Sequence, residues 1–439
     1  MTQLKDSLSW YSAFSLVVGS MIGTGVFLKS ATMAQWVGSP VGVMAAWVLA
    51  GILSLLGALT YSEMGKRYPQ VGGEYVYLRE SYGPLPAFLY GWTRFWIAST
   101  GSVAAYGVGA ATFLNGAISL EGLGGKTSAA LIFIGLYTVV NCFAVSMGGK
   151  VQSIMTSMKI GMVLVLILGL LFFSIGPPSD PFLSLIKPDK SSMFSGLGMA
   201  ILSALWAFDG WNNLPMAASE VKNSSRNVPR ALILGTLLVL ILYLSLNWVF
   251  FKTLGFTEVL TSNSSRYPDA LPLATKAVHH IAGEYSKIIV SCFFVFSSLG
   301  AMNGSILTGS RVPFAMAQDG LFFSRFKKLH PKSCVPVFSV ATQGVWAMVL
   351  AYSGTFDQIT DYVIFSSWIF YGAIGLAVFQ MKTSLKWIAF TFSLSAMALL
   401  VNTIYTSPKE TLVGLVFILL GIPFFFGYRK TGIPKTMPS

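Results

Sequence analysis

The sequence predicts an all-α integral membrane protein with twelve transmembrane helices. The 439 residues are 54% hydrophobic and only 10% charged, and their mean hydropathy is +0.68. A water-soluble chain of this length would carry many more charged side chains on its surface. Runs of about 20 apolar residues recur along the chain, and each is long enough to cross a bilayer as a helix.

Twelve apolar runs are expected to form these spans. No cleavable signal peptide is expected, because the first run lacks a basic flank and continues into the fold. No long polar stretch separates two halves, which indicates one membrane domain without a soluble partner domain. The expected spans cover residues 10–36, 40–65, 84–116, 127–147, 150–175, 192–221, 228–253, 285–317, 335–353, 358–381, 385–405 and 411–428.

Basic residues are concentrated in the loops on one side of the predicted membrane. With the N-terminus in the cytoplasm, the cytoplasmic loops contain 18 of the 29 lysines and arginines, the opposite loops contain 8, and 3 lie within spans. This bias is the positive-inside pattern, and it predicts that both termini are cytoplasmic. Membrane topology therefore explains the net charge of +13, which gives no support to nucleic-acid binding.

Cysteine and histidine patterns give no support to an enzyme, a metal site or a cofactor. Cys142, Cys292 and Cys334 fall within or beside spans and have no CxxC spacing. His279 and His280 are adjacent, which is a poor geometry for chelating one ion from a single helix face. No phosphate-binding glycine loop and no nucleophile–base pair is apparent, so no catalytic residue is predicted.

The first span contains three glycines in seven residues, in the stretch GSMIGTG at 19–25. Irregular backbone persists in hydrocarbon only where it lines a cavity or meets a ligand, because unpaired N–H and C=O groups are costly there. A break would expose N–H groups on the second half of the span and carbonyls on the first. These groups fit the carboxylate and ammonium of a zwitterion. The alternative is that Gly19, Gly23 and Gly25 form a small-residue packing face.

The sixth span contains a second interruption, LWAFDGWNN at 205–213, with Asp209 at membrane depth. A carboxylate there normally faces a partner, a substrate or water. Spans one and six are the first members of two consecutive sets of five. Matching interruptions in such positions predict an inverted-repeat transporter with its binding site at the membrane midplane.

Five stretches of the sequence carry a family resemblance. They are GSMIGTGVF (19–27), YSEMGKRYPQVGGEYVYLRESYG (61–83), LWAFDGWNNLPMAASEVKN (205–223), RNVPRA (226–231) and NGSILTGSR (303–311). These motifs resemble those of the amino acid–polyamine–organocation (APC) superfamily, most closely its bacterial L-type amino acid transporter (LAT) branch. The resemblance implies the LeuT-like fold and alternating access for free amino acids, usually by exchange. It implies a transporter core in residues 1–381, made of two inverted five-helix repeats at about 10–175 and 192–381, and two peripheral helices with a short cytoplasmic tail in 382–439.

The resemblance also implies a substrate site at the two interruptions. The α-carboxylate would lie on the backbone of the first break, and the α-amino group would meet carbonyls of both breaks. Trp206 occupies the position of an aromatic gate, although an ordinary core aromatic is the alternative. The implied substrate-binding residues are Val18, Gly19, Ser20, Met21, Ile22, Gly23, Thr24, Gly25, Trp206, Ala207, Phe208 and Asp209.

Two further residues are implied to act in gating or coupling. Lys159 lies about nine residues into the fifth span, where the resembling branch has a lysine in place of a bound cation. Its alternative is a side chain that extends outward to the membrane surface. Tyr243 matches a tyrosine of the branch that approaches the break in span one, although a lone membrane tyrosine is more often a packing residue.

Three other residues depart from the family pattern or carry charge. Lys29 follows the first motif, where the family more often has an uncharged residue, and it is expected to line the outer vestibule. Arg94 is expected to extend its side chain to the cytoplasmic surface. Pro215 is expected to alter the second half of span six.

The expected function is sodium-independent exchange of neutral L-amino acids, because Trp206 and the many Met and Phe residues favour an apolar pocket. Asp209 leaves a cationic side chain open as an alternative. A proton-coupled permease and a membrane amino acid sensor are further alternatives. The loop at 119–128 lacks the cysteine that links animal relatives to a heavy chain, so a stand-alone carrier in a bacterial inner membrane is expected, with lipid and the amino acid as partners.

Overall fold

The computed structural model describes residues 8–143, 148–174, 193–331, 333–354 and 356–432. Within these ranges helices are joined by turns and irregular loops, and the one β feature is an isolated bridge between Leu8 and Val221. Among the described residues, ten helical segments are long and apolar enough to cross a membrane, and two shorter apolar helices cover Ser195–Phe208 and Val337–Ser353. The all-α membrane class is therefore confirmed. The expected count of twelve is met only if both short helices are included.

Most of the long helices begin and end within a few residues of the predicted boundaries, whereas the sixth and eighth predicted spans are each divided into two helices. In chain order they are α1 (Trp10–Met21), α2 (Gly25–Val37), α3 (Pro40–Arg67), α4 (Glu74–Tyr82), α5 (Pro84–Thr93), the π-helix η1 (Arg94–Ser99), α6 (Thr100–Ala117), α7 (Gly125–Phe143), α8 (Gly148–Phe173), α9 (Met193–Phe208), α10 (Asn213–Met216), α11 (Ser224–Thr253), α12 (Phe256–Leu260), α13 (Leu273–Ala282), α14 (Ser286–Gly309), α15 (Arg311–Gln318), α16 (Val337–Ser353), α17 (Phe356–Phe379), α18 (Lys386–Thr406) and α19 (Pro408–Gly432). The predicted span ends at 144–147, 175 and 192 lie outside the described residues.

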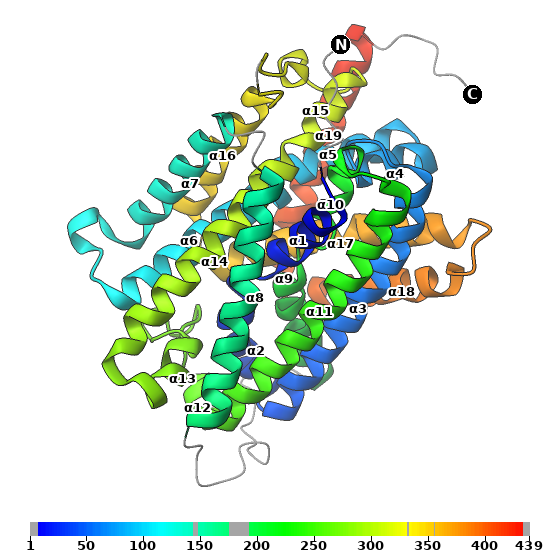
Figure 1. Cartoon of the computed structure of the whole chain (residues 1–439). Helices are drawn as coiled ribbons and strands as arrows, with labels where there is room; N and C mark the ends of the chain where they lie inside the picture. The colour runs from blue at the N-terminus through cyan, green and yellow to red at the C-terminus, as the bar shows by residue number, and fades with distance from the viewer. Residues whose placement is uncertain (1–7, 144–147, 175–192, 332, 355, 433–439) are drawn as a thin grey trace.

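The two interrupted spans lie at the centre of the helix bundle (Figure 1). Helices α1 and α2 form the first of them and α9 and α10 the second, and α2 packs along α9. Around this centre α3 packs on α11, α6 on α14 and α17 on α18. The short helices α4 and α15 lie at one end of the molecule, whereas α12 and α13 lie at the opposite end.

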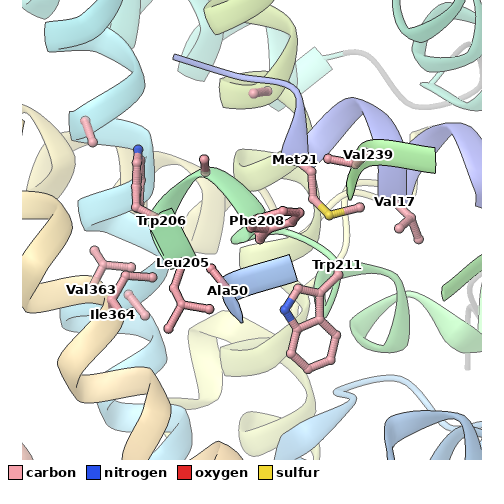
Figure 2. Packing of buried hydrophobic residues seen from close by; sticks show 14 of the residues in the cluster. Val17, Met21, Ala50, Leu205, Trp206, Phe208, Trp211, Val239, Val363 and Ile364 are labelled. Atoms are coloured by element: carbon pink, nitrogen blue, oxygen red, sulfur yellow. The ribbon is translucent and has the colours of Figure 1, made fainter. Parts of the chain in front are cut away.

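Small residues bring the two interrupted spans into close contact. A Cβ added at Gly25 would lie 2.6 Å from the Cα of Ala207, so only glycine permits this approach of α2 to α9. Figure 2 shows how the larger side chains fill the space around the contact: Phe208 points toward Met21, while Trp206 lies on the side of Val363 in α17. The central packing is thus continuous across both breaks.

The second half of the sixth span is shorter than expected. The sequence predicts a span over 192–221, but α9 ends at Phe208 and α10 has only four residues, including Pro215. A 3₁₀ turn at Ala218–Glu220 then leads toward α11. Proline lacks a backbone N–H and fixes its own φ, which accounts for the absence of a longer helix after the break.

Candidate functional site

The break in the first span covers Ile22 to Thr24, between α1 and α2, and every residue from 19 to 25 is buried. Ile22 N–H donates to Val18 at 2.9 Å, which closes the end of α1. On the other side of the break, α2 begins at Gly25 and no side chain caps it. Among the described residues no acceptor faces the backbone N–H groups of Thr24, Gly25 and Val26. These N–H groups at a helix N-terminus form a site suited to an anion.

The break in the sixth span covers Asp209 to Asn212 and depends on a glycine with positive φ. Gly210 has φ +115°, a conformation that residues with a Cβ rarely adopt. A Cβ at this position would also lie 2.8 Å from the Cβ of Ser20 in α1. The break therefore brings the two interrupted spans together. In this part of the chain the carbonyls of Phe208 and Asp209 accept no backbone hydrogen bond, so they can receive an ammonium group.

Tyr243 of α11 lies between the two breaks. Its hydroxyl oxygen is 2.7 Å from the carbonyl of Met21 and 2.9 Å from the carbonyl of Ala207, and the side chain is fully buried. A phenol has one proton to donate, so it can satisfy one of these two carbonyls at a time. The residue thus connects the ends of α1 and α9 directly.

Lys159 of α8 points into the protein, and its side chain is 0% exposed. Its Nζ donates to the carbonyl of Gly19 at 2.8 Å and to the carbonyl of Ile22 at 3.0 Å. The hydroxyl of Ser297 donates to the same Ile22 carbonyl at 3.1 Å. A lysine that extended to the membrane surface would make neither bond. The amine therefore satisfies two carbonyls at the C-terminal end of α1, where the helix dipole favours a positive charge.

Trp206 of α9 packs between two aromatic side chains. The indole is 2% exposed, with its ring centroid 5.6 Å from that of Tyr106 and 6.1 Å from that of Phe356. Tyr106 in turn donates its hydroxyl proton to the carbonyl of Ser20 at 3.2 Å. The Trp206 ring thus contacts both Tyr106, which bonds to the first span, and Phe356 at the start of α17.

An ion pair between Lys29 of α2 and Asp357 of α17 lies beyond Phe356. The Lys29 Nζ is 2.6 Å from Asp357 Oδ1, donates to Thr360 at 2.7 Å, and lies 5.0 Å from the ring centroid of Phe356. A cavity of about 370 Å³ next to this pair is lined by Leu28 and Asp357 but not by Lys29. The expectation that Lys29 lines an outer vestibule is therefore wrong, because its partners keep it buried at 1% exposure.

A buried polar cluster lies beside the second break. Arg94 Nη2 donates to Asn213 Oδ1 at 2.7 Å, and Asn212 Nδ2 donates to Glu74 Oε1 at 2.8 Å. The carboxyl groups of Glu74 and Asp209 both interact electrostatically with the Arg94 guanidinium. We define the polar cluster as Glu74, Arg94, Asp209, Asn212, Asn213 and Tyr371, all of which are buried.

Several buried polar atoms of the polar cluster have no hydrogen-bond partner. Within the described chain, Nε and Nη1 of Arg94, Oε2 of Glu74 and Oδ1 of Asp209 are buried without a partner. Burial raises the pKa of the Glu74 carboxyl, while the nearby Arg94 and the Asn212 amide act in the opposite direction. The polar cluster contains two carboxyl groups and one guanidinium. The positive charge of Arg94 lowers the free-energy cost of burying the two acids.

Comparison with known proteins decides the family. The model of a family described as amino acid permease matches residues 8–437, which is nearly the whole chain. The chain belongs to the amino acid permease family. It is therefore an integral membrane transporter and not an enzyme.

Three curated relatives show how widely this permease family varies in named substrate. The permease is 28% identical to the b(0,+)-type amino acid transporter 1 of Mus musculus, over 97% of this chain and 88% of that protein. It is 28% identical to the serine/threonine exchanger SteT of Bacillus subtilis, over 97% and 98%. It is 26% identical to the cystine/glutamate transporter of Homo sapiens, over 97% and 85%.

Sequence reasoning misplaced one member of the polar cluster, Arg94, and did not identify two others, Glu74 and Tyr371. The expectation that Arg94 extends to the surface is wrong, because its side chain is 3% exposed and bonded to Asn213. Glu74 was not identified as a buried acid, although it directly follows two glycines in GGEY. Both glycines have positive φ, and Gly73 lies against the backbone of Pro215. This close approach places Glu74 beside Asn212 of the second break.

The glycines of the first break also serve packing. A Cβ on Gly23 would lie 2.7 Å from Cε1 of Tyr106, and one on Gly19 would collide with Thr156 of α8. Gly25 contacts Ala207, as described above. The small-residue packing alternative therefore applies to all three positions, and it coexists with the free N–H groups that follow the break.

Proposed function

We propose that this permease is a sodium-independent exchanger of neutral L-amino acids that works by alternating access. The observation that carries the proposal is the meeting of two interrupted helices at the centre of the bundle. Unpaired N–H groups of Thr24, Gly25 and Val26 lie on one break, and unpaired carbonyls of Phe208 and Asp209 lie on the other. An α-amino acid has one anionic and one cationic group, which match these two sets of backbone atoms.

The proposed substrate pose differs in one respect from the expectation based on sequence. Carbonyls near Val18 and Gly19 were expected to receive the substrate ammonium, but they already accept bonds from Ile22 and Lys159. The carbonyls of the sixth-span break have more free capacity. We therefore assign the substrate carboxylate to the first break and its ammonium mainly to the second.

Sodium independence is supported by Lys159. Broken-helix transporters coordinate sodium with carbonyls at half-helix C-terminal ends. Here the Lys159 amine donates to two such carbonyls, Gly19 and Ile22, and a fixed side chain in that place removes the need for a metal ion. The proposal extends to a bacterial inner membrane with both termini in the cytoplasm. No linked heavy subunit is proposed, because the loop at 119–128 contains no cysteine.

The first test is counterflow in proteoliposomes. Vesicles preloaded with a neutral amino acid are expected to accumulate external label at least about tenfold faster than empty vesicles, in choline buffer without sodium. Equal uptake into empty vesicles would contradict exchange, and uptake driven by an imposed pH gradient would indicate the proton-coupled alternative. A sensor would bind amino acid in the same preparation without any flux.

A cationic amino acid is the second candidate substrate, because the b(0,+)-type name and Asp209 both leave it open. Two features of this site favour a neutral side chain instead. The Arg94 guanidinium lies near Asp209 and opposes the binding of a second positive charge there, and the Trp206 ring adds apolar surface. Excess arginine or lysine is therefore expected to inhibit exchange of labelled alanine or leucine by less than about twofold.

Competition with an Asp209→Asn variant decides between the two candidates. Strong inhibition of the unaltered protein by cationic amino acids, lost in Asp209→Asn, would overturn the neutral assignment. Weak inhibition in both proteins would support it. Competition by excess serine and threonine in the same assay serves as the positive control for access to the site.

A further inference from the structure

One face of α11 has a charged end and an apolar remainder. Arg226 and Arg230 lie four residues apart in the RNVPRA stretch and are both exposed. The next exposed residues on the same face are Leu234, Leu237 and Ile241, at 46%, 40% and 54% exposure. Spacings of three and four residues place all five side chains on one side of the helix. The apolar part runs about 16 Å from Arg230 to Ile241, roughly the depth of one bilayer leaflet.

A cavity opens at the charged end of this face. It has a volume of about 440 Å³ and is lined by residues from the starts of two helices. Arg226 and Arg230 of α11 line it together with Trp10, the first residue of α1. The remaining lining residues are Asn223, Asn227 and Leu234. Helices α8 and α11 contact each other, and both contact α1.

The two guanidinium groups at the cavity are uncompensated. Neither Arg226 nor Arg230 has an acidic partner among the residues that the structure describes. The nearest acid along the chain, Glu220, is already paired with Arg311 at 3.2 Å. Trp10 is 37% exposed and stacks on Phe14 with ring centroids 5.5 Å apart. An exposed tryptophan of this kind is typical of the membrane–water interface.

We propose that this cavity binds the phosphate headgroup of an anionic phospholipid. Arg226 and Arg230 donate to the phosphate oxygens, Trp10 lies against the glycerol region, and the acyl chains follow Leu234, Leu237 and Ile241 toward the midplane. Guanidinium groups recognise phosphate through paired N–H donors, and basic pockets at the cytoplasmic ends of membrane helices suit anionic lipid. A bound lipid would connect the start of α1 to the start of α11.

The positive-inside pattern alone does not account for this arrangement. That pattern requires a number of basic residues in cytoplasmic loops, but it places no demand on their spacing or surroundings. Here two arginines share a cavity with a tryptophan from another helix, at the end of an apolar face as deep as one leaflet. A free phosphate ion would use the arginines but not that apolar face.

The test measures contact between Trp10 and lipid in reconstituted full-length protein. The Trp10 fluorescence is obtained as the difference between the unaltered protein and Trp10→Phe, which keeps the ring contact with Phe14. We compare quenching by dibrominated phosphatidylglycerol with quenching by dibrominated phosphatidylcholine at equal mole fractions. The expected result is a preference for phosphatidylglycerol on the order of tenfold, which decreases at high salt.

Two double variants make the result specific to the cavity. Arg226→Gln/Arg230→Gln is expected to remove the preference while the protein remains monodisperse, because both side chains are exposed. Lys382→Gln/Lys386→Gln removes two exposed positive charges near another exposed tryptophan, Trp387. This second double variant is expected to retain the preference for phosphatidylglycerol. Equal quenching by both lipids, or equal loss in both double variants, would overturn the proposal. So would loss of the preference on adding inorganic phosphate but not chloride of the same ionic strength.

Discussion

Replacing Lys159 with methionine is expected to lower the rate of amino acid exchange by at least about tenfold while the protein still inserts and folds. The substitution leaves the Gly19 carbonyl without its donor, whereas the Ile22 carbonyl keeps the Ser297 hydroxyl. An unpaired buried carbonyl costs about 1–3 kcal/mol, which is small for a protein of this size but large for one step of transport. Counterflow normalised to the amount of monodisperse protein measures the effect.

Two glycine variants separate the position of the Lys159 amine from general effects on helix packing. Gly300→Ala keeps the lysine but adds a Cβ that would lie 2.9 Å from its Cε and 3.1 Å from its Nζ. It is therefore expected to reduce exchange by displacing the amine. Gly161→Ala lies on α8 itself, where an added Cβ meets nothing within 4 Å, and is expected to be neutral.

Lys159→Arg tests whether a positive charge of different shape can replace the lysine ammonium. A rigid guanidinium fork does not reproduce a point-like ammonium at two carbonyls, so it is not expected to restore exchange. Normal exchange in Lys159→Met, or exchange by the unaltered protein that rises with external sodium, would contradict the assignment of the lysine in place of a cation.

Replacing Arg94 with methionine is expected to destabilise the folded protein by about 3–5 kcal/mol. Arg94 is the positive charge of the polar cluster, and its loss leaves the carboxyl groups of Glu74 and Asp209 buried without compensation. It also removes the donor to Asn213. The expected observation is a large fall in the temperature at which the detergent-solubilised protein loses its monodisperse peak.

A second substitution and a matched control test this explanation. Adding Glu74→Gln to Arg94→Met removes one uncompensated acid and is expected to recover part of the lost stability, as a double-mutant cycle would measure. Lys66→Met breaks an exposed ion pair with Glu63 and is expected to change stability by less than about 1 kcal/mol. If the Arg94 and Lys66 variants unfold at the same temperature, the polar cluster does not depend on its arginine.

The interruptions could be predicted from sequence because their signals are local. Glycines at 19, 23 and 25, and Asp209 followed by Gly210, mark backbone that cannot remain an ordinary membrane helix. The breaks at Ile22–Thr24 and Asp209–Asn212 fall within the predicted stretches. The contacts of Lys159 and Tyr243 were reached only through family resemblance, because neither periodicity nor composition distinguishes them from packing residues.

Partners across long distances in sequence could not be predicted in the same way. Lys29 pairs with Asp357, 328 residues away, and Arg94 bonds to Asn213, 119 residues away. Each pair depends on which helices become neighbours, and the local patterns of a single sequence do not indicate how distant helices pack together. Short helices such as α4 and α13 were also missed, because segments of ten residues or fewer give no clear periodic signal.

The π-helix at Arg94–Ser99 has a consequence for the third span as a whole. A π-turn contains one residue more than an α-turn, and each residue of a helix turns the chain by about 100°. Before this segment, the Trp92 indole N–H donates to Phe417 of the peripheral helix α19 at 3.0 Å. After it, Tyr106 donates to Ser20 at the first break. Deleting one residue from the π-turn would rotate the two halves of the span against each other, so Trp92 and Tyr106 could not both keep their partners. A single extra residue therefore fixes how far the first half of the span, which contacts α19, is rotated relative to the second half, which contacts the first break.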